Sequence, residues 1–279
     1  MANRPITILL AGIGVNLSIG VLYAWSVFKD SLVDELGWTA TQASTPYSVA
    51  IVVFSIATLA AGVLQDRIGP RKVIVTGGIL VGLGMILSGQ LSGPNTVIFT
   101  FGVMVGTGIG FAYACVTPAA MKWWHPSQKG MVSGLIVGGF ALGAVYVAPL
   151  TKMLVNSYDI HTAFTLLGIG IIIISVSLGL TVVNPPADYK ASDPKNWDVK
   201  AAQTRSNLEV PWRDMIRTRQ FYFLFIMFAL ASSAGVMLIG NITKVAAVQV
   251  GLRGAVYLIG LPLSGGYSTS VSGFRRRPG

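Results

Sequence analysis

The stretch Gly62-Val63-Leu64-Gln65-Asp66-Arg67-Ile68-Gly69-Pro70-Arg71-Lys72 decides the fold, because it joins two long apolar segments through a short charged turn. Gly69 can adopt a positive φ and Pro70 cannot extend the incoming helix, so the pair predicts a turn between two helices. Arg67, Arg71 and Lys72 form a positive cluster beside both segments, which is typical of a cytoplasmic loop. Asp66 lies at the C-terminal end of the first helix, where the helix dipole disfavours an acid, so we expect its partner elsewhere.

Composition indicates a membrane protein. Of the 279 residues, 53% are hydrophobic and 11% are charged, whereas a soluble domain has about a quarter charged residues. The net charge of +10 would suit nucleic acid, but the basic residues occupy short loops between apolar segments. We therefore expect a lipid bilayer, and no nucleic acid, as a partner. The single cysteine, Cys115, excludes an intrachain disulfide and is expected to be a small buried side chain.

Seven segments reach the roughly twenty apolar residues that a membrane helix needs. They are predicted at residues 5–28, 43–65, 72–91, 95–120, 129–156, 161–183 and 220–242. One set of loops is basic: Arg4, Arg67/Arg71/Lys72, Lys122/Lys129 and the 184–219 stretch. The other set holds Lys29, Asp30, Asp34, Glu35 and Asp159. Because Lys and Arg mark the cytoplasmic side, we predict a multi-pass protein of the inner (cytoplasmic) or plasma membrane with its N-terminus inside.

The segments predict four parts of the chain. Residues 1–183 form a six-helix transmembrane bundle, 184–219 a charged cytoplasmic loop that cannot bury a core, and 220–242 a seventh transmembrane helix. Residues 243–279 are atypical, because the apolar run 255–263 is too short to span a membrane and a Ser/Gly/Thr-rich, basic end follows it. This predicts a truncated or out-of-frame tail.

The order Gly62-x-Leu64-x-Asp66-Arg67-x-Gly69-x-Arg71-Lys72 closely resembles the loop signature between helices 2 and 3 of major facilitator superfamily transporters. The layout of six helices, a long charged loop and further helices is similar as well. The resemblance implies an all-α, polytopic membrane fold: the six-helix N-terminal bundle plus a seventh transmembrane helix, with the C-terminal half missing. It also implies an inner gating latch formed by Gly62, Asp66, Arg67, Gly69, Arg71 and Lys72.

An internal repeat points to a candidate site. Gly20-x-x-Tyr23-Ala24 recurs as Gly110-x-x-Tyr113-Ala114 in the fourth span, and the halves of this superfamily contain inverted repeats. Each tyrosine falls late in its span and the spans run oppositely, so we expect the two side chains on opposite sides of the midplane, each roughly 10 Å beyond it. The alternative is a pair of interfacial tyrosines in the aromatic belts.

Further motifs narrow the resemblance. Tyr23-Ala24-Trp25, Gly69-Pro70-Arg71 and Trp124-x-Pro126-x-x-x-Gly130-x-x-Ser133-Gly134 together resemble the oxalate/formate antiporter family. That resemblance implies that Tyr23, Tyr113 and Phe140 flank a small carboxylate anion. The alternative for Phe140 is a lipid-facing side chain.

The sequence thus predicts secondary transport of small carboxylates, of the oxalate/formate exchange type, by alternating access. Because no charged residue lies in the middle of a span and the second half is missing, the chain alone is expected to be inactive and to self-associate through its exposed half-bundle face. Two alternatives are a proton-coupled monocarboxylate transporter and a non-transporting remnant or interaction protein. No nucleophile–base pair or metal-ligand set is present, so we expect neither an enzyme nor a cofactor or metal.

Three further expectations concern glycine, histidine and lysine residues outside the main motifs. Gly102, Gly106 and Gly110 predict a close helix-packing face rather than a nucleotide site. His125 and His161 are expected to be solvated loop side chains. Lys152 and Lys244 are expected near outer helix ends, where they either extend to the interface or attract anions.

Overall fold

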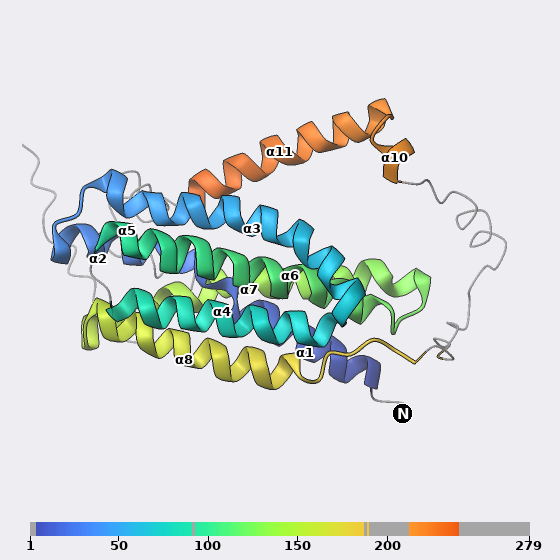
Figure 1. Cartoon of the computed structure of the whole chain (residues 1–279), viewed down its shortest axis with the longest axis horizontal. Helices are drawn as coiled ribbons and strands as arrows, with labels where there is room; N and C mark the ends of the chain where they lie inside the picture. Colours follow the sequence, from blue (N-terminus) through green and yellow to red (C-terminus); the bar gives the residue numbers. More distant parts are fainter. Residues whose placement is uncertain (1–3, 91–92, 187–188, 190–211, 240–279) are drawn as a thin grey trace, which may run out of the picture.

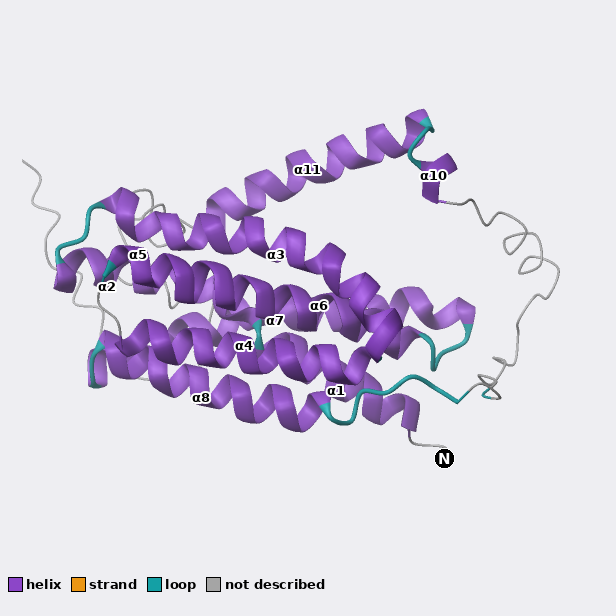
Figure 2. Cartoon of the chain, viewed as in Figure 1, coloured by secondary structure: helices purple, strands orange, loops and turns teal. Residues whose placement is uncertain are grey.

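The computed structural model describes the chain except for residues 1–3, 91–92, 187–188, 190–211 and 240–279. Every regular element among the described residues is a helix (Figure 2). Most of the predicted 184–219 loop and all of the predicted tail, residues 243–279, lie outside the described residues. The membrane segments in chain order are α1 (Arg4–Ser18), η1 (Gly20–Ala24) and α2 (Trp25–Leu36); α3 (Ala40–Ile68); α4 (Pro70–Gln90); α5 (Pro94–Val97), η2 (Ile98–Val105) and α6 (Gly106–Met121); η3 (Pro126–Gln128) and α7 (Lys129–Ser157); and α8 (Ile160–Gly179).

Six segments in the described part of the chain are long and apolar enough to cross a membrane, and they begin within a few residues of the predicted starts. The all-α polytopic fold is therefore confirmed. The predicted seventh helix is present as α11 (Arg219–Ile239), which follows the short α10 (Trp212–Met215). The end of its predicted range, residues 240–242, lies outside the described residues.

The first segment corrects the prediction, because it continues as helix to Leu36 instead of ending at residue 28. Lys29, Asp30, Asp34 and Glu35 are consequently helical residues rather than loop residues. Lys29 is 9% exposed, so its aliphatic part packs within the protein. The hydropathy pattern misplaced this boundary since charges interrupt the apolar run before the helix itself ends.

The signature stretch folds as its residues predict. Helix α3 ends at Ile68, Gly69 has φ 85°, and Pro70 is the first residue of α4. The Gly69 backbone N–H donates to the Gln65 carbonyl at 2.9 Å, which closes the last turn of α3. In Figure 1 the start of α1, the α3–α4 turn, the α6–α7 connection and the end of α8 all lie at one end of the bundle. Among the described residues, the connections predicted to share one side therefore do so.

The glycines of the fourth segment pack on α3, as predicted. A Cβ on Gly106 would lie 2.7 Å from the Ala50 carbonyl oxygen, and one on Gly110 would lie 2.7 Å from the Ala57 Cβ. On the opposite side, a Cβ on Gly108 would lie 2.5 Å from the Gly77 carbonyl oxygen of α4. Glycine lets these backbones approach this closely, and such approach drives helix association in membranes.

Three of the described membrane segments depart from α-helical geometry, and one of them, the fifth, does so only in the short 3-10 helix η3 at its start. In the first, η1 is a 3-10 turn between α1 and α2, at Gly20–Ala24. In the fourth, η2 is an eight-residue π-helix, Ile98–Val105, which contains Gly102 and ends just before Gly106. The 3-10 turn η1 contains Tyr23, a residue of the candidate site described below.

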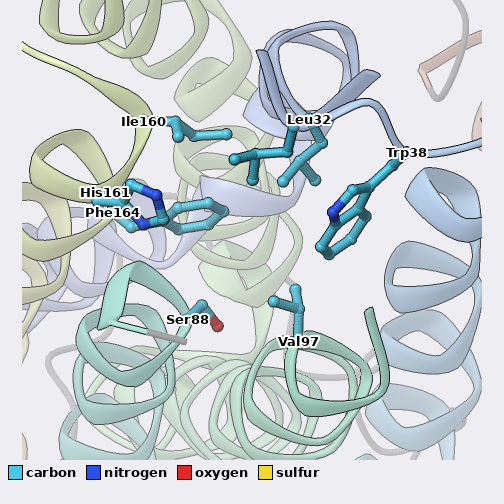
Figure 3. Close-up of a pocket in the computed structure, with 8 residues that line it drawn as sticks. Leu32, Trp38, Ser88, Val97, Ile160, His161 and Phe164 are labelled. Atoms are coloured by element: carbon cyan, nitrogen blue, oxygen red, sulfur yellow. The ribbon is translucent and has the colours of Figure 1, made fainter. Parts of the chain in front are cut away.

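The end of the bundle away from the α3–α4 turn has an aromatic core. The Phe28 and Phe164 rings stack at 4.0 Å, and the Trp25 ring lies 4.3 Å from that of Phe101. Beside this core a cavity of about 10 Å³ has room for about one water molecule. Figure 3 shows the side chains of Leu32, Trp38, Ser88, Val97, Ile160, His161 and Phe164 around it.

The two histidines are not the solvated side chains that were expected. His161 lines this cavity, and its Nδ1 donates to the Gly89 carbonyl oxygen at 2.7 Å. His125 is 8% exposed, and its Nδ1 accepts the Ser127 backbone N–H at 3.4 Å. Both rings cap or bridge helix ends, where unpaired backbone groups attract polar side chains.

Trp123 anchors the chain as it leaves the bundle. Its indole Nε1 donates to the Val183 carbonyl at 2.7 Å, and the Tyr189 ring lies 4.8 Å from the indole. The Tyr189 hydroxyl in turn donates to the Trp123 carbonyl at 3.1 Å. The beginning of the predicted 184–219 loop is thus attached to the end of α6.

Candidate functional site

Three predicted site residues meet in the bundle. Tyr23 comes from η1, Tyr113 from α6 and Phe140 from α7. The Phe140 ring centroid lies 5.4 Å from that of Tyr23 and 5.1 Å from that of Tyr113, with tilted and edge-on geometries. All three side chains are half-buried. Phe140 is therefore not simply a lipid-facing residue, because it packs between both tyrosines.

The spacing of the tyrosines differs from the prediction. Opposite placement roughly 10 Å beyond the midplane would separate them by roughly 20 Å along the membrane normal. Since both rings contact the same Phe140 ring, they lie much closer than that. The reason is the length of the first segment, which runs from Arg4 to Leu36 and so places Tyr23 near its centre. Tyrosines at this depth are not part of an interfacial belt.

Close helix crossings bring the rings together. A Cβ on Gly20 would lie 3.1 Å from the Gly143 Cα, and one on Gly139 would lie 3.0 Å from the Ile13 carbonyl oxygen. Glycine at these positions allows α7 to approach both α1 and the start of η1 closely. The Tyr146 hydroxyl donates to the Leu17 carbonyl at 2.9 Å, just before the 3-10 turn. These contacts fix η1, and therefore Tyr23, against α7.

Helix α3 contributes two aromatic residues that the sequence reasoning missed. The Phe54 ring lies 5.7 Å from that of Tyr113, edge-on. Tyr47 is 8% exposed and lies about two turns before Phe54 on the same helix. We call these five residues, Tyr23, Tyr47, Phe54, Tyr113 and Phe140, the aromatic cluster.

The tyrosine hydroxyls of the aromatic cluster are available to a ligand. In the part of the chain that the structure describes, no residue forms a hydrogen bond with the hydroxyl of Tyr23, Tyr47 or Tyr113. The hydroxyls of Tyr146 and Tyr189, by contrast, donate to backbone carbonyls. The cluster thus offers ring surfaces and unused O–H donors, but no positive charge of its own.

The predicted latch residues surround the α3–α4 turn. Asp66, Arg67, Arg71 and Lys72 are exposed, and none of the described residues forms an ion pair with Asp66. A Cβ on Gly62 would meet nothing within 4 Å, so this side of α3 is open.

Asp159, a carboxylate in the turn between α7 and α8, stabilises the start of α8. It is the N-cap of α8, and the Thr162 backbone N–H donates to its carboxylate. This hydrogen bond, together with that from the Thr162 side chain, lowers the pKa of Asp159. Since the folded-state pKa is the lower one, the cap stabilises α8 above the ordinary carboxylate pKa and is lost as the pH falls through the lowered value.

Six membrane-spanning segments around a half-buried aromatic cluster, with basic loops gathered at one end, define a polytopic helical membrane protein with the features of a solute transporter. The chain belongs to the Major Facilitator Superfamily, whose family model matches residues 6–276. That is a family of transporters and not of enzymes.

Three relatives illustrate the similarity. The chain is 25% identical to the uncharacterized MFS-type transporter YhjX of Escherichia coli K12 over 83% of its own length and 55% of the relative's. It is 24% identical to the oxalate:formate antiporter of Oxalobacter formigenes over 94% of its length and 60% of the relative's. It is 27% identical to monocarboxylate transporter 13 of Rattus norvegicus over 51% and 33% of the two lengths. The chain thus spans little more than half the length of the first two relatives.

Proposed function

We propose that the chain takes part in secondary transport of small carboxylates by alternating access, with exchange of the oxalate/formate type. The observation that carries this proposal is the aromatic cluster, where the rings of Tyr23, Phe140 and Tyr113 meet and the tyrosine hydroxyls have no described partner. A small anion bound against this cluster would accept hydrogen bonds from the tyrosine O–H groups, and hydrogen bonds to a charged acceptor are the stronger kind. The similarity to an oxalate:formate antiporter supports the same substrate class.

Removing single hydroxyls tests the proposal. In the purified chain, Tyr23→Phe and Tyr113→Phe are each expected to weaken oxalate binding about 10- to 150-fold, because a hydrogen bond to a charged group contributes about 1.5–3 kcal/mol. The ring contacts with Phe140 remain in both variants. Ligand-induced thermal stabilisation at increasing oxalate concentration measures the affinity.

Tyr158→Phe is the matched control, since Tyr158 is 68% exposed beyond the end of α7 and outside the aromatic cluster. Oxamide, the neutral diamide of oxalate, serves as the control ligand and is expected to bind more weakly than oxalate. Equal oxalate affinity in the wild type and both cluster variants would refute a binding role for these tyrosines.

A second candidate is proton-coupled uptake of a monocarboxylate. His161 favours it, because its partly buried side chain lies at the start of α8 and lines a small cavity, and histidine is a common proton shuttle. A monocarboxylate transporter is also among the relatives. In vesicles, formate uptake that is driven by a proton gradient and lost in His161→Gln would favour this candidate over exchange.

We propose that Gly62, Asp66, Arg67, Gly69, Arg71 and Lys72 form a latch that holds one conformation of the transport cycle. The lack of an ion-pair partner for Asp66 among the described residues supports it. In a full-length relative, Asp66→Asn at the matching position is expected to shift the inward/outward balance. Cysteine accessibility on both sides measures that balance, and an unchanged pattern would exclude the latch.

We propose that the basic end of the bundle is cytoplasmic. The N-terminus then lies on the cytoplasmic side of the inner or plasma membrane. The gathering of Arg67, Arg71, Lys72, Lys122 and Lys129 at that end supports this orientation. In a Cys115→Ala background, Ser127→Cys is expected to resist an impermeant reagent added outside, while Asp34→Cys reacts. The reverse pattern would invert the orientation.

The open side of α3 leads to a proposal of self-association. Val52, Ile56 and Leu59 are 59–77% exposed along one stripe of this helix. A second copy of the chain would cover them. Cross-linking of Ser55→Cys in the membrane is expected to yield dimers, and its failure would speak against this contact.

A further inference from the structure

A groove on the outside of the bundle combines two cations with an apolar wall. It has a volume of about 560 Å³ and lies where α3 ends, α4 begins and α8 ends. Arg71 and Lys72 lie at the start of α4, while Ile68, Val75, Ile79 and Leu180 supply the apolar lining. Eight residues separate Arg71 from Ile79, so the lining extends roughly 12 Å along α4 into the membrane-spanning region.

The positive charges of Arg71 and Lys72 in this groove favour binding of an anion. Both cations are exposed, and neither forms an ion pair with a carboxylate in the part of the chain that the structure describes. The first turn of α4 contains no acidic residue. The backbone dipole of α4 adds partial positive charge at the same helix start. The positive charges of Arg71 and Lys72 therefore lie together there without a carboxylate in the first turn of α4 to balance them.

The shape of the groove selects among anions. A free phosphate would contact the cationic end alone and leave the apolar wall uncovered. An acidic peptide would have to place its chain along Val75 and Ile79, where its backbone groups would lack water. A molecule with an anionic head joined to hydrocarbon chains matches both parts and is supplied by the bilayer itself.

We propose that this groove binds an anionic phospholipid, with the headgroup phosphate between Arg71 and Lys72 and an acyl chain along Val75, Ile79 and Leu180. This site goes beyond the proposed transport function and does not depend on it. The lipid lies on the outer surface of the bundle, whereas the aromatic cluster lies among η1, α3, α6 and α7.

Native mass spectrometry of the detergent-purified chain, titrated with phosphatidylglycerol and with phosphatidylcholine, tests the proposal. We expect a saturable phosphatidylglycerol adduct that phosphatidylcholine does not reproduce. Arg71→Gln/Lys72→Gln is expected to weaken it by about fivefold for each charge removed, because a basic side chain near an anionic lipid surface contributes about 1 kcal/mol.

Two matched variants separate this site from general attraction. Lys122→Gln/Lys129→Gln removes two exposed charges at the same end of the bundle and is expected to leave the adduct unchanged. Val75→Trp fills the apolar wall without altering charge and is expected to weaken the adduct several-fold, whereas Leu83→Trp, further along α4 and 42% exposed, is not.

Three results would overturn the proposal. These are equal binding of the two lipids, equal losses in the two double-charge variants, and displacement by inorganic phosphate with no effect of Val75→Trp. The last result would assign the cations to a free anion. Each measurement reports lipid binding alone, so none depends on transport.

Discussion

Gly106→Val is expected to leave little folded protein. The first atom of the new side chain would lie 2.7 Å from the Ala50 carbonyl oxygen and 3.1 Å from the Ala50 Cα, and the two γ-methyl groups would reach further into α3. Overpacking a core costs about 1–3 kcal/mol when side chains can yield. Here the atoms met are backbone, so we expect a cost at or above the upper end, against a total stability of about 5–15 kcal/mol.

The matched control is Gly134→Val on α7, where an added Cβ would meet nothing within 4 Å. Both changes place the same β-branched residue in a membrane helix, so they share its intrinsic effect on helix formation. The yield of monodisperse protein and the midpoint of thermal unfolding in detergent are the measurements. Similar losses in both variants would show that the glycine face of the fourth segment does not determine the packing on α3.

Trp25→Ala is expected to destabilise the bundle by about 3–5 kcal/mol, the usual cost of deleting a large buried aromatic side chain. The Trp25 side chain is 1% exposed and packs on Phe101 at 4.3 Å. Its Nε1 donates to the Ala43 carbonyl at 3.0 Å, which links α2 to the start of α3. Trp25→Phe keeps part of the packing and removes the hydrogen bond, so its cost should be smaller.

Tyr23→Ala, two residues earlier, serves as the comparison. Tyr23 is half-buried and its hydroxyl has no described partner, so we expect a smaller loss of stability and a larger loss of oxalate binding. Thermal unfolding and oxalate titration on the same two variants separate the roles. If Trp25→Ala left the unfolding midpoint unchanged, the aromatic core at the end away from the α3–α4 turn would not be a source of stability.

Helix positions could be predicted from the sequence because a membrane span is recognised by its length and its apolar composition. The turn at Gly69 and Pro70 could be predicted too, since each residue restricts the backbone in a known way. The end of the first segment could not. Lys29 and its acidic neighbours interrupt the apolar run, yet the helix continues to Leu36 because hydrogen bonding along a helix does not require apolar side chains.

The candidate site was predicted only in part. Tyr23, Tyr113 and Phe140 were found through a repeat and a family resemblance, and the structure brings their rings together. Tyr47 and Phe54 were missed, because a helix that is apolar on all sides does not reveal which face turns inward. What brings Phe54 to Tyr113 is the close approach that Gly106 and Gly110 permit between α3 and the fourth segment. That contact between distant parts of the chain has no local signal.

The π-helical stretch Ile98–Val105 has a consequence for comparing this chain with its relatives. A π-turn holds more backbone than an α-turn, so it absorbs an inserted residue locally while the helix continues on either side. In a plain α-helix the same insertion would swing every later side chain by about 100° and turn Gly106, Gly110 and Tyr113 away from their partners. A one-residue gap opposite residues 98–105 in an alignment would therefore record a loss of the π-turn, with the glycine face and the tyrosine kept in place.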